Sequence, residues 1–156
     1  MHLKLLCKPL LIAVILLFTT TACNRYISTY DQFAYAQTTS LKVDVLNLID
    51  KSTETYTNHQ AEAEKVKSDM MKAVEYEKHR PNNGVTVRMW NHMIDSTTQS
   101  GIVGRYLASW KSSGTKSQTL INEVKQQVSE GFDLIADLES QKIQSSDARI
   151  TNFVNK

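Results

Sequence analysis

Residues 45–77 read VLNLIDKSTETYTNHQAEAEKVKSDMMKAVEYE, and this stretch decides the fold that the sequence predicts. A row of positions three and four residues apart runs through it, and seven of its ten members are apolar. The row consists of Val45, Ile49, Ser52, Tyr56, His59, Ala63, Val66, Met70, Ala73 and Glu77. Charged side chains fill many positions between them, as on the solvated face of an amphipathic helix. The polar members Ser52 and His59 mark a place where this helix can bend, loosen or change partner.

The predicted helix begins near Thr29 and ends before a break at residues 80–84. Thr29 lies three residues before Gln32, in the spacing of a capping box. The break reads Arg80-Pro81-Asn82-Asn83-Gly84. Proline disfavours helix at the residue before it, and Asn-Gly favours a tight turn. No glycine or proline interrupts the chain between these two points, so the sequence predicts one long first helix.

Two short helices and a second long helix follow the break. The short helices are expected at residues 86–95, with Thr86 as cap, and at residues 102–111, with a loop at residues 96–101 between them. The second long helix is expected from Ser117 to about residue 143, on an apolar row of Ile121, Val124, Val128, Gly131, Ile135 and Leu138. Gly131 either admits a bulky neighbour, such as Tyr56 or a tryptophan, or is simply tolerated.

Neither long helix can bury its apolar row alone, which predicts an all-α fold in which the two pack against each other. The expected architecture is an elongated, coiled-coil-like antiparallel pair of long helices, with the two short helices forming a cap between them. Four segments are predicted: residues 1–22 as a signal peptide that is removed, residues 23–28 as a lipidated cysteine and short tether, residues 29–144 as the helical domain, and residues 145–156 as a polar tail. The tail is either a frayed turn or a docked short helix.

The N-terminus has the parts of an export signal. Lys4 and Lys8 precede an unbroken apolar stretch at residues 10–18, and small residues follow. As a helix, nine residues cover about 14 Å, roughly half of a hydrocarbon core, so a permanent transmembrane helix is disfavoured. The two lysines also account for the net charge of +2, because residues 23–156 hold 16 basic and 16 acidic side chains. A neutral body argues against nucleic acid as a partner.

The segment Thr20-Thr21-Ala22-Cys23 resembles the lipobox of bacterial lipoproteins. The resemblance implies cleavage between Ala22 and Cys23, lipidation (palmitate included) of Cys23, and anchoring in a membrane. Asn24 in the next position implies sorting to the outer membrane, with the body in the periplasm. The alternative is an ordinary secretory signal in which Cys23 is an incidental thiol. A disulfide is not expected, because the other cysteine, Cys7, lies in the removed segment.

The sequence contains no pattern that is typical of an active site or a cofactor site. No two histidines are four residues apart, so the usual ligand spacing of a helical metal site is missing. Glu130, Asp133 and Asp137 share one helical face, as a solvated stripe or as candidate acid–base carboxylates. Three aromatic residues of the expected cap, Trp90, Tyr106 and Trp110, either fill its core or line a ligand pocket.

These features predict a non-enzymatic, lipid-anchored envelope protein that acts as a structural, adaptor or interaction component. Its expected partners are the membrane, through the lipid, and another protein or a second copy, through the helices. The alternative function is a periplasmic ligand- or client-binding protein that uses the aromatic cap, as a chaperone might. No metal or cofactor is expected for either function.

Overall fold

The computed structural model describes residues 28–99 and 101–155, and its secondary structure in these ranges is helical throughout. The helices are α2 (Gln32–Asp50), α3 (Gln60–Lys78), α4 (Gly84–Ile94), α5 (Val103–Ser113), α6 (Gln118–Glu139) and α7 (Ala148–Val154). Two short 3₁₀ turns, η2 (Lys51–Thr53) and η3 (Tyr56–His59), lie between α2 and α3. The prediction of an all-α fold is confirmed.

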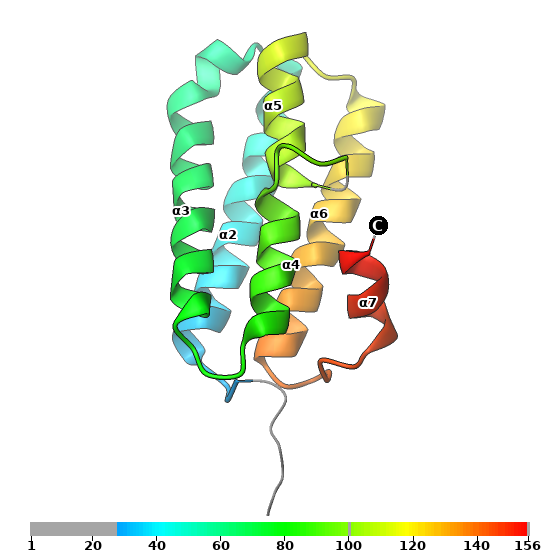
Figure 1. Ribbon diagram of the computed structural model, residues 1–156. Helices are drawn as coiled ribbons and strands as arrows, with labels where there is room; N and C mark the ends of the chain where they lie inside the picture. The colour runs from blue at the N-terminus through cyan, green and yellow to red at the C-terminus, as the bar shows by residue number, and fades with distance from the viewer. Residues whose placement is uncertain (1–27, 100, 156) are drawn as a thin grey trace, which may run out of the picture.

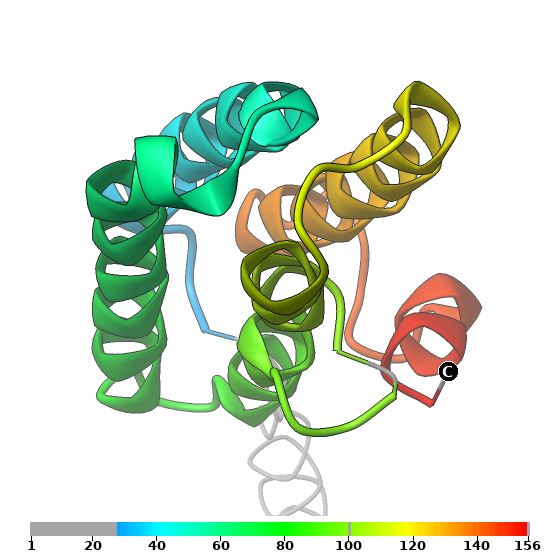
Figure 2. The ribbon, with the colours of Figure 1, turned by 90° about the horizontal axis from the view of Figure 1, so that it is seen from above.

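The helices form an up-and-down bundle with four columns (Figure 1). α2 runs away from the end at which residue 28 lies, α3 returns, α4 and α5 together run away again, and α6 returns. Seen from above, the columns surround a common core (Figure 2), since α2 packs against α3 and α6, and α4 also packs against α3 and α6. The short α7 lies outside the bundle against α4 and α6. We call the end at which residue 28 lies the base.

The predicted first long helix is two helices, so the arrangement differs from the expected antiparallel pair with a cap. α2 and α3 each have 19 residues, and the chain reverses between them at residues 51–59. This segment, KSTETYTNH, is rich in side chains that bond to nearby backbone and weaken a helix. The Ser52 hydroxyl donates to the Ile49 carbonyl at 2.6 Å, and the Trp110 indole donates to the Glu54 carbonyl at 2.9 Å. Because the chain reverses here, the part of the apolar row in α2 and the part in α3 face the same core from neighbouring columns.

Several helix ends also differ from the prediction. The cap of α2 is Asp31 and not Thr29, because the Asp31 carboxylate accepts from the backbone N–H groups of Phe33 (2.8 Å) and Ala34 (3.1 Å). Residue 83 is the cap position of α4, and Thr86 is buried inside it. α6 ends at Glu139, short of residue 143. The break at residues 80–83 is confirmed, and Asn82 adopts the left-handed conformation there, with φ of 57°.

The tail folds back as α7, which buries Ile150 and Phe153. Gly131 allows this close approach, because a Cβ at residue 131 would lie 2.6 Å from Met93 Sδ and 2.9 Å from the Phe153 ring. The glycine thus admits bulky neighbours, although they are not Tyr56 or a tryptophan. None of the helices in the described ranges is long and apolar enough to cross a bilayer.

Candidate functional site

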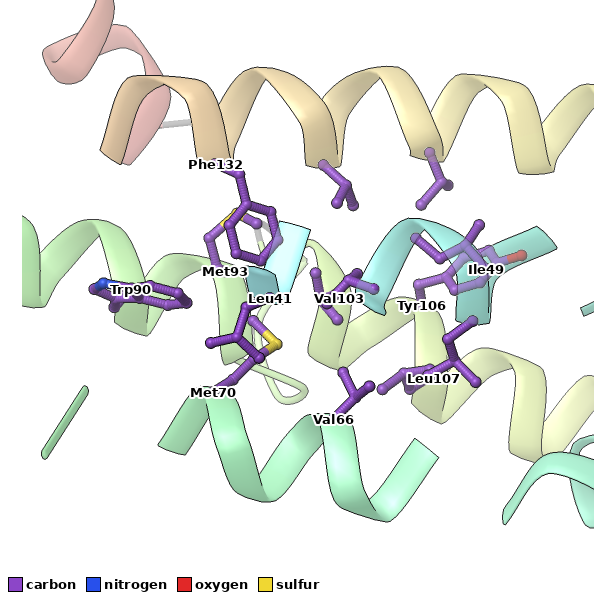
Figure 3. Packing of buried hydrophobic residues seen from close by; sticks show 14 of the residues in the cluster. Leu41, Ile49, Val66, Met70, Trp90, Met93, Val103, Tyr106, Leu107 and Phe132 are labelled. Atoms are coloured by element: carbon purple, nitrogen blue, oxygen red, sulfur yellow. The ribbon is translucent and has the colours of Figure 1, made fainter. Parts of the chain in front are cut away.

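The three predicted aromatic residues lie in the core of the bundle. Trp90 and Trp110 are fully buried and Tyr106 is 5% exposed. Trp90 makes an edge contact with the Phe132 ring, at a centroid distance of 5.6 Å, and Trp110 makes one with Tyr56 at 5.3 Å. Figure 3 shows Trp90 and Tyr106 among the apolar side chains that converge there from α2 to α6. These residues pack the interior and offer almost no surface to a ligand.

The predicted acidic stripe lies at the surface between α6 and α7. Glu130, Asp133 and Asp137 line a hollow of about 360 Å³ together with residues of α7 that include Arg149. Asp133 is paired with Lys42 of α2 at 2.6 Å, and the nearest cation to Asp137 is Lys142 at 3.6 Å. The stripe is therefore solvated and partly neutralised by lysines. Within the described ranges, no group of three or more His, Cys, Asp or Glu side chains is placed to hold a metal ion.

The lipidation and cleavage residues, Ala22 and Cys23, lie outside the described residues, as does the whole predicted signal peptide. The nearest described residue is Ser28, at the base of the bundle (Figure 1). The way in which the bundle holds this end of the chain consequently bears on any function that depends on the N-terminal segment.

A buried polar cluster at the base is the feature that the sequence did not predict. Arg80 lies between the carboxylates of Glu77, at the end of α3, and Glu139, at the end of α6. Its Nη1 donates to Glu77 Oε2 at 2.7 Å and also to Glu139 Oε2. The Asn83 amide donates to the Glu77 carboxylate, and the Thr86 hydroxyl donates to Glu139 Oε1 at 3.0 Å. We call these five residues the Arg80 cluster.

The cluster places two carboxylates in the interior beside a single cation. Glu77 is 1% exposed and Glu139 is 4% exposed. Burial raises the pKa of Glu77 to about 7, and the nearby Glu139 charge adds to this rise, whereas Arg80 and Asn83 oppose it. The charged form of Glu77 is therefore disfavoured in the folded chain, because the single Arg80 guanidinium is shared between two buried carboxylates.

Arg80 also holds the segment through which the chain enters the bundle, residues 28–31. Its Nη2 donates to the Thr29 carbonyl at 2.7 Å, and its Nε lies 3.7 Å from the Asp31 carboxylate. The Tyr76 hydroxyl donates to Asp31 Oδ2 at 2.6 Å, and this hydrogen bond, with the two helix-capping N–H groups, lowers the pKa of Asp31. The Gln141 amide donates to the Ser28 carbonyl at 3.4 Å. The entry segment is thus fixed to α3, to the α3–α4 turn and to the segment after α6.

One sequence feature could have indicated this cluster: Glu77 occupies an apolar-row position, where a charged residue needs a buried partner.

No protein-family model matches the chain, and neither a curated protein sequence nor a solved structure gives a significant match. The functional proposal therefore depends on the chain's own sequence and contacts.

Proposed function

We propose that the chain is a lipid-anchored, non-enzymatic lipoprotein of the bacterial cell envelope, sorted to the outer membrane, whose helical bundle acts as a structural or adaptor component in the periplasm. The observation that carries the proposal is the lipobox-like segment Thr20-Thr21-Ala22-Cys23, which lies directly before a helical body. Two acyl chains or more give firm attachment, because each buried CH₂ contributes about 0.8 kcal/mol. No membrane-binding helix of the body is then needed.

The fixed entry segment supports this function. Cys23 and Ser28 are five residues apart, which limits their separation to about 18 Å even in a fully extended chain. Arg80 binds the Thr29 carbonyl and Gln141 binds the Ser28 carbonyl, so the chain is held by the bundle from Ser28 onward. A lipid on Cys23 would hold the base close to the membrane, and α6, with its 22 residues, would carry the other end about 33 Å further. Such a geometry suits a short spacer or adaptor.

The fold limits which surfaces of the chain a protein partner could bind. The apolar rows that suggested association between helices are used inside the chain, where Val45, Ile49 and Val128 are fully buried. A partner or a second copy would therefore contact the outer faces of the bundle. The alternative function is ligand binding by Trp90, Tyr106 and Trp110. It loses its main support because these three side chains are buried in the core and have almost no accessible surface.

Metabolic labelling of the full chain with an alkyne-bearing fatty acid tests the anchor. We expect the wild type to be labelled in a diderm bacterium and Cys23→Ala to lose the label. Cys7→Ala is the matched control, because Cys7 lies in the segment that is removed, and it should be labelled like the wild type. Equal labelling of Cys23→Ala would refute the proposal.

Two further measurements test the outer-membrane localisation and the adaptor role. In membranes separated by density, the wild type should fractionate with the outer membrane, whereas Asn24→Asp should move to the inner membrane and Asn24→Ser should not. Photocrosslinking from exposed positions of α2 and α3 in intact cells should give a discrete crosslinked species that contains a partner or a second copy. A chain that remains monomeric and uncrosslinked at every position would contradict the adaptor role.

A further inference from the structure

Two large aromatic side chains are exposed at the base of the bundle, one in the entry segment and one in the first turn of α2. Tyr30 is 52% exposed and Phe33 is 58% exposed. The Phe33 ring lies against Tyr76 of α3, at a centroid distance of 4.9 Å, and the Tyr30 ring lies 6.4 Å from that of Tyr35. We call these four residues the base patch. It joins the first turn of α2 to the last turn of α3, which lie side by side at the base (Figure 1).

The base patch is held in place by the polar contacts beneath it. Asp31 lies between Tyr30 and Phe33 in the chain, caps α2, and accepts the hydrogen bond from the Tyr76 hydroxyl. Arg80 fixes the Thr29 carbonyl on the other side of Tyr30. These contacts fix the backbone that carries both rings, and the Phe33 ring also packs against Tyr76. A patch of this kind is organised before it meets its partner, which lowers the entropic cost of binding.

The position of the base patch indicates a lipid surface as the partner. It begins two residues after Ser28, and Ser28 lies within about 18 Å of Cys23 along the chain. Tyrosine rings have an apolar body and a polar hydroxyl, and for this reason they are favoured where hydrocarbon meets lipid headgroups. Lys78, at the end of α3, pairs with Glu75 at 3.3 Å, and Lys142, after α6, pairs with Asp137 at 3.6 Å. Both lysine side chains are exposed and long enough to exchange these carboxylates for lipid phosphate groups.

We propose that the base patch docks on the lipid surface beside the anchor, so that Tyr30 and Phe33 lie in the headgroup layer and the bundle stands away from the membrane. This inference rests on the proposed lipid at Cys23. Docking would give the bundle a fixed orientation on the membrane, in which the α5–α6 end is presented to the periplasm.

The two glutamines that begin α2 and α6 offer matched reporter positions. Gln32 and Gln118 are both exposed first residues of their helices, and they lie at opposite ends of the bundle. The full chain is purified from membranes as Gln32→Cys or as Gln118→Cys, labelled on the new thiol with an environment-sensitive fluorophore, and reconstituted in vesicles of phosphatidylethanolamine and phosphatidylglycerol. Some of the lipids carry a nitroxide quencher at the headgroup end of the acyl chain.

We expect a blue shift and strong quenching at position 32, and neither at position 118, which is about 30 Å further from the surface in an upright bundle. Replacing both exposed rings, Tyr30→Ser with Phe33→Ser, should abolish the quenching at position 32. The control replaces two exposed apolar residues away from the base, Val43→Ser with Leu120→Ser, and should leave the quenching unchanged.

The outcomes separate this inference from the anchor itself. If the parent chain, without an introduced thiol, takes up the fluorophore on Cys23, the lipid is absent and both proposals fail. If the parent is unlabelled but positions 32 and 118 are quenched equally, or not at all, the anchor stands and docking is refuted. A blue shift at position 32 that grows with protein density, without quenching by the lipid, would show that the patch binds a second copy and would also refute docking.

Discussion

Replacing Glu77 by glutamine removes a buried charge while keeping the shape of the side chain, and its effect on stability should depend strongly on pH. Burial raises the pKa of Glu77 in the folded chain from 4.5 to about 7. The folded state therefore binds this proton more tightly than the unfolded state does. The contribution of Glu77 to stability is highest below about pH 4.5 and is lost as the pH rises to about 7. Glutamine does not titrate, so the variant lacks this loss.

The size of the effect follows from the shift. One pKa unit corresponds to about 1.4 kcal/mol, so a rise from 4.5 to about 7 corresponds to about 3 kcal/mol. The free energy of unfolding of Glu77→Gln, minus that of the wild type, should increase by about this amount between pH 4 and pH 8. Residues 24–156, purified without the lipid, can be unfolded in urea and followed by tryptophan fluorescence, because Trp90 and Trp110 are fully buried.

Glu75→Gln is the matched control, two residues away on the same helix. Glu75 is exposed, and the hydrogen bonds from Lys78 and His79 lower its pKa, so the pH dependence of this variant should be small and of opposite sign. A difference for Glu77→Gln that stays constant with pH would refute the conclusion that the buried carboxylate is undercompensated. A difference that falls as the pH rises would show that Arg80 stabilises the Glu77 charge by more than burial costs.

Two other substitutions test the packing at the base and beneath α7. Arg80→Met leaves Glu77 and Glu139 buried without a cation, so its free energy of unfolding in urea at neutral pH should be about 3–5 kcal/mol below that of the wild type. Arg80→Lys keeps a cation and should lose less. An unchanged stability of Arg80→Met would contradict the cluster as described. Gly131→Ala gains about 1 kcal/mol of helix propensity but forces Met93 and Phe153 aside, at a cost of about 1–3 kcal/mol. We therefore expect a lower free energy of unfolding and weaker hydrogen-exchange protection of α7. Gly84→Ala, whose Cβ would meet nothing closer than 3.9 Å, is its control and should be neutral or slightly stabilising; equal effects of the two alanines would refute the close contact at Gly131.

The sequence predicted those parts of the fold that depend on neighbouring residues. The break at Pro81, the apolar row of α6 and the two short helices α4 and α5 follow from local propensity and periodicity, and all are present. The reversal at residues 51–59 was missed because the apolar row continues in phase on both sides of it. A period of three and four residues cannot distinguish one straight helix from two that fold back on the same core. The run of Ser, Thr and Asn in KSTETYTNH was the local sign of the turn.

The Arg80 cluster could not be predicted from periodicity, because its members come together only in the folded chain. Glu139 lies 59 residues from Arg80 in sequence. The sequence places Glu139 inside the second long helix and Arg80 in the break, and gives no sign that the two meet. The tail was left open between a frayed turn and a docked short helix for a related reason: seven residues form a stable helix only when they dock, and the docking depends on Gly131, in the middle of another helix. The aromatic trio was open to two interpretations because a sequence does not show which side chains the core will enclose.

The composition of the Arg80 cluster argues that its role is to position the chain and not to stabilise it. Apolar residues of similar volume stabilise a helix junction as well as a buried ion pair does, or better, because they incur no desolvation cost. Apolar side chains cannot, however, bind the Thr29 carbonyl or the Asp31 carboxylate, and those contacts set the direction in which residues 28–31 approach the bundle. The opposite end has no such requirement: at the turn before α3, one indole hydrogen bond and a buried hydroxyl pair, Ser52 with Tyr106, are present. Polar burial is thus concentrated where the chain meets the segment that we propose to be its anchor, and a fixed approach there is what an orientation relative to the membrane would require.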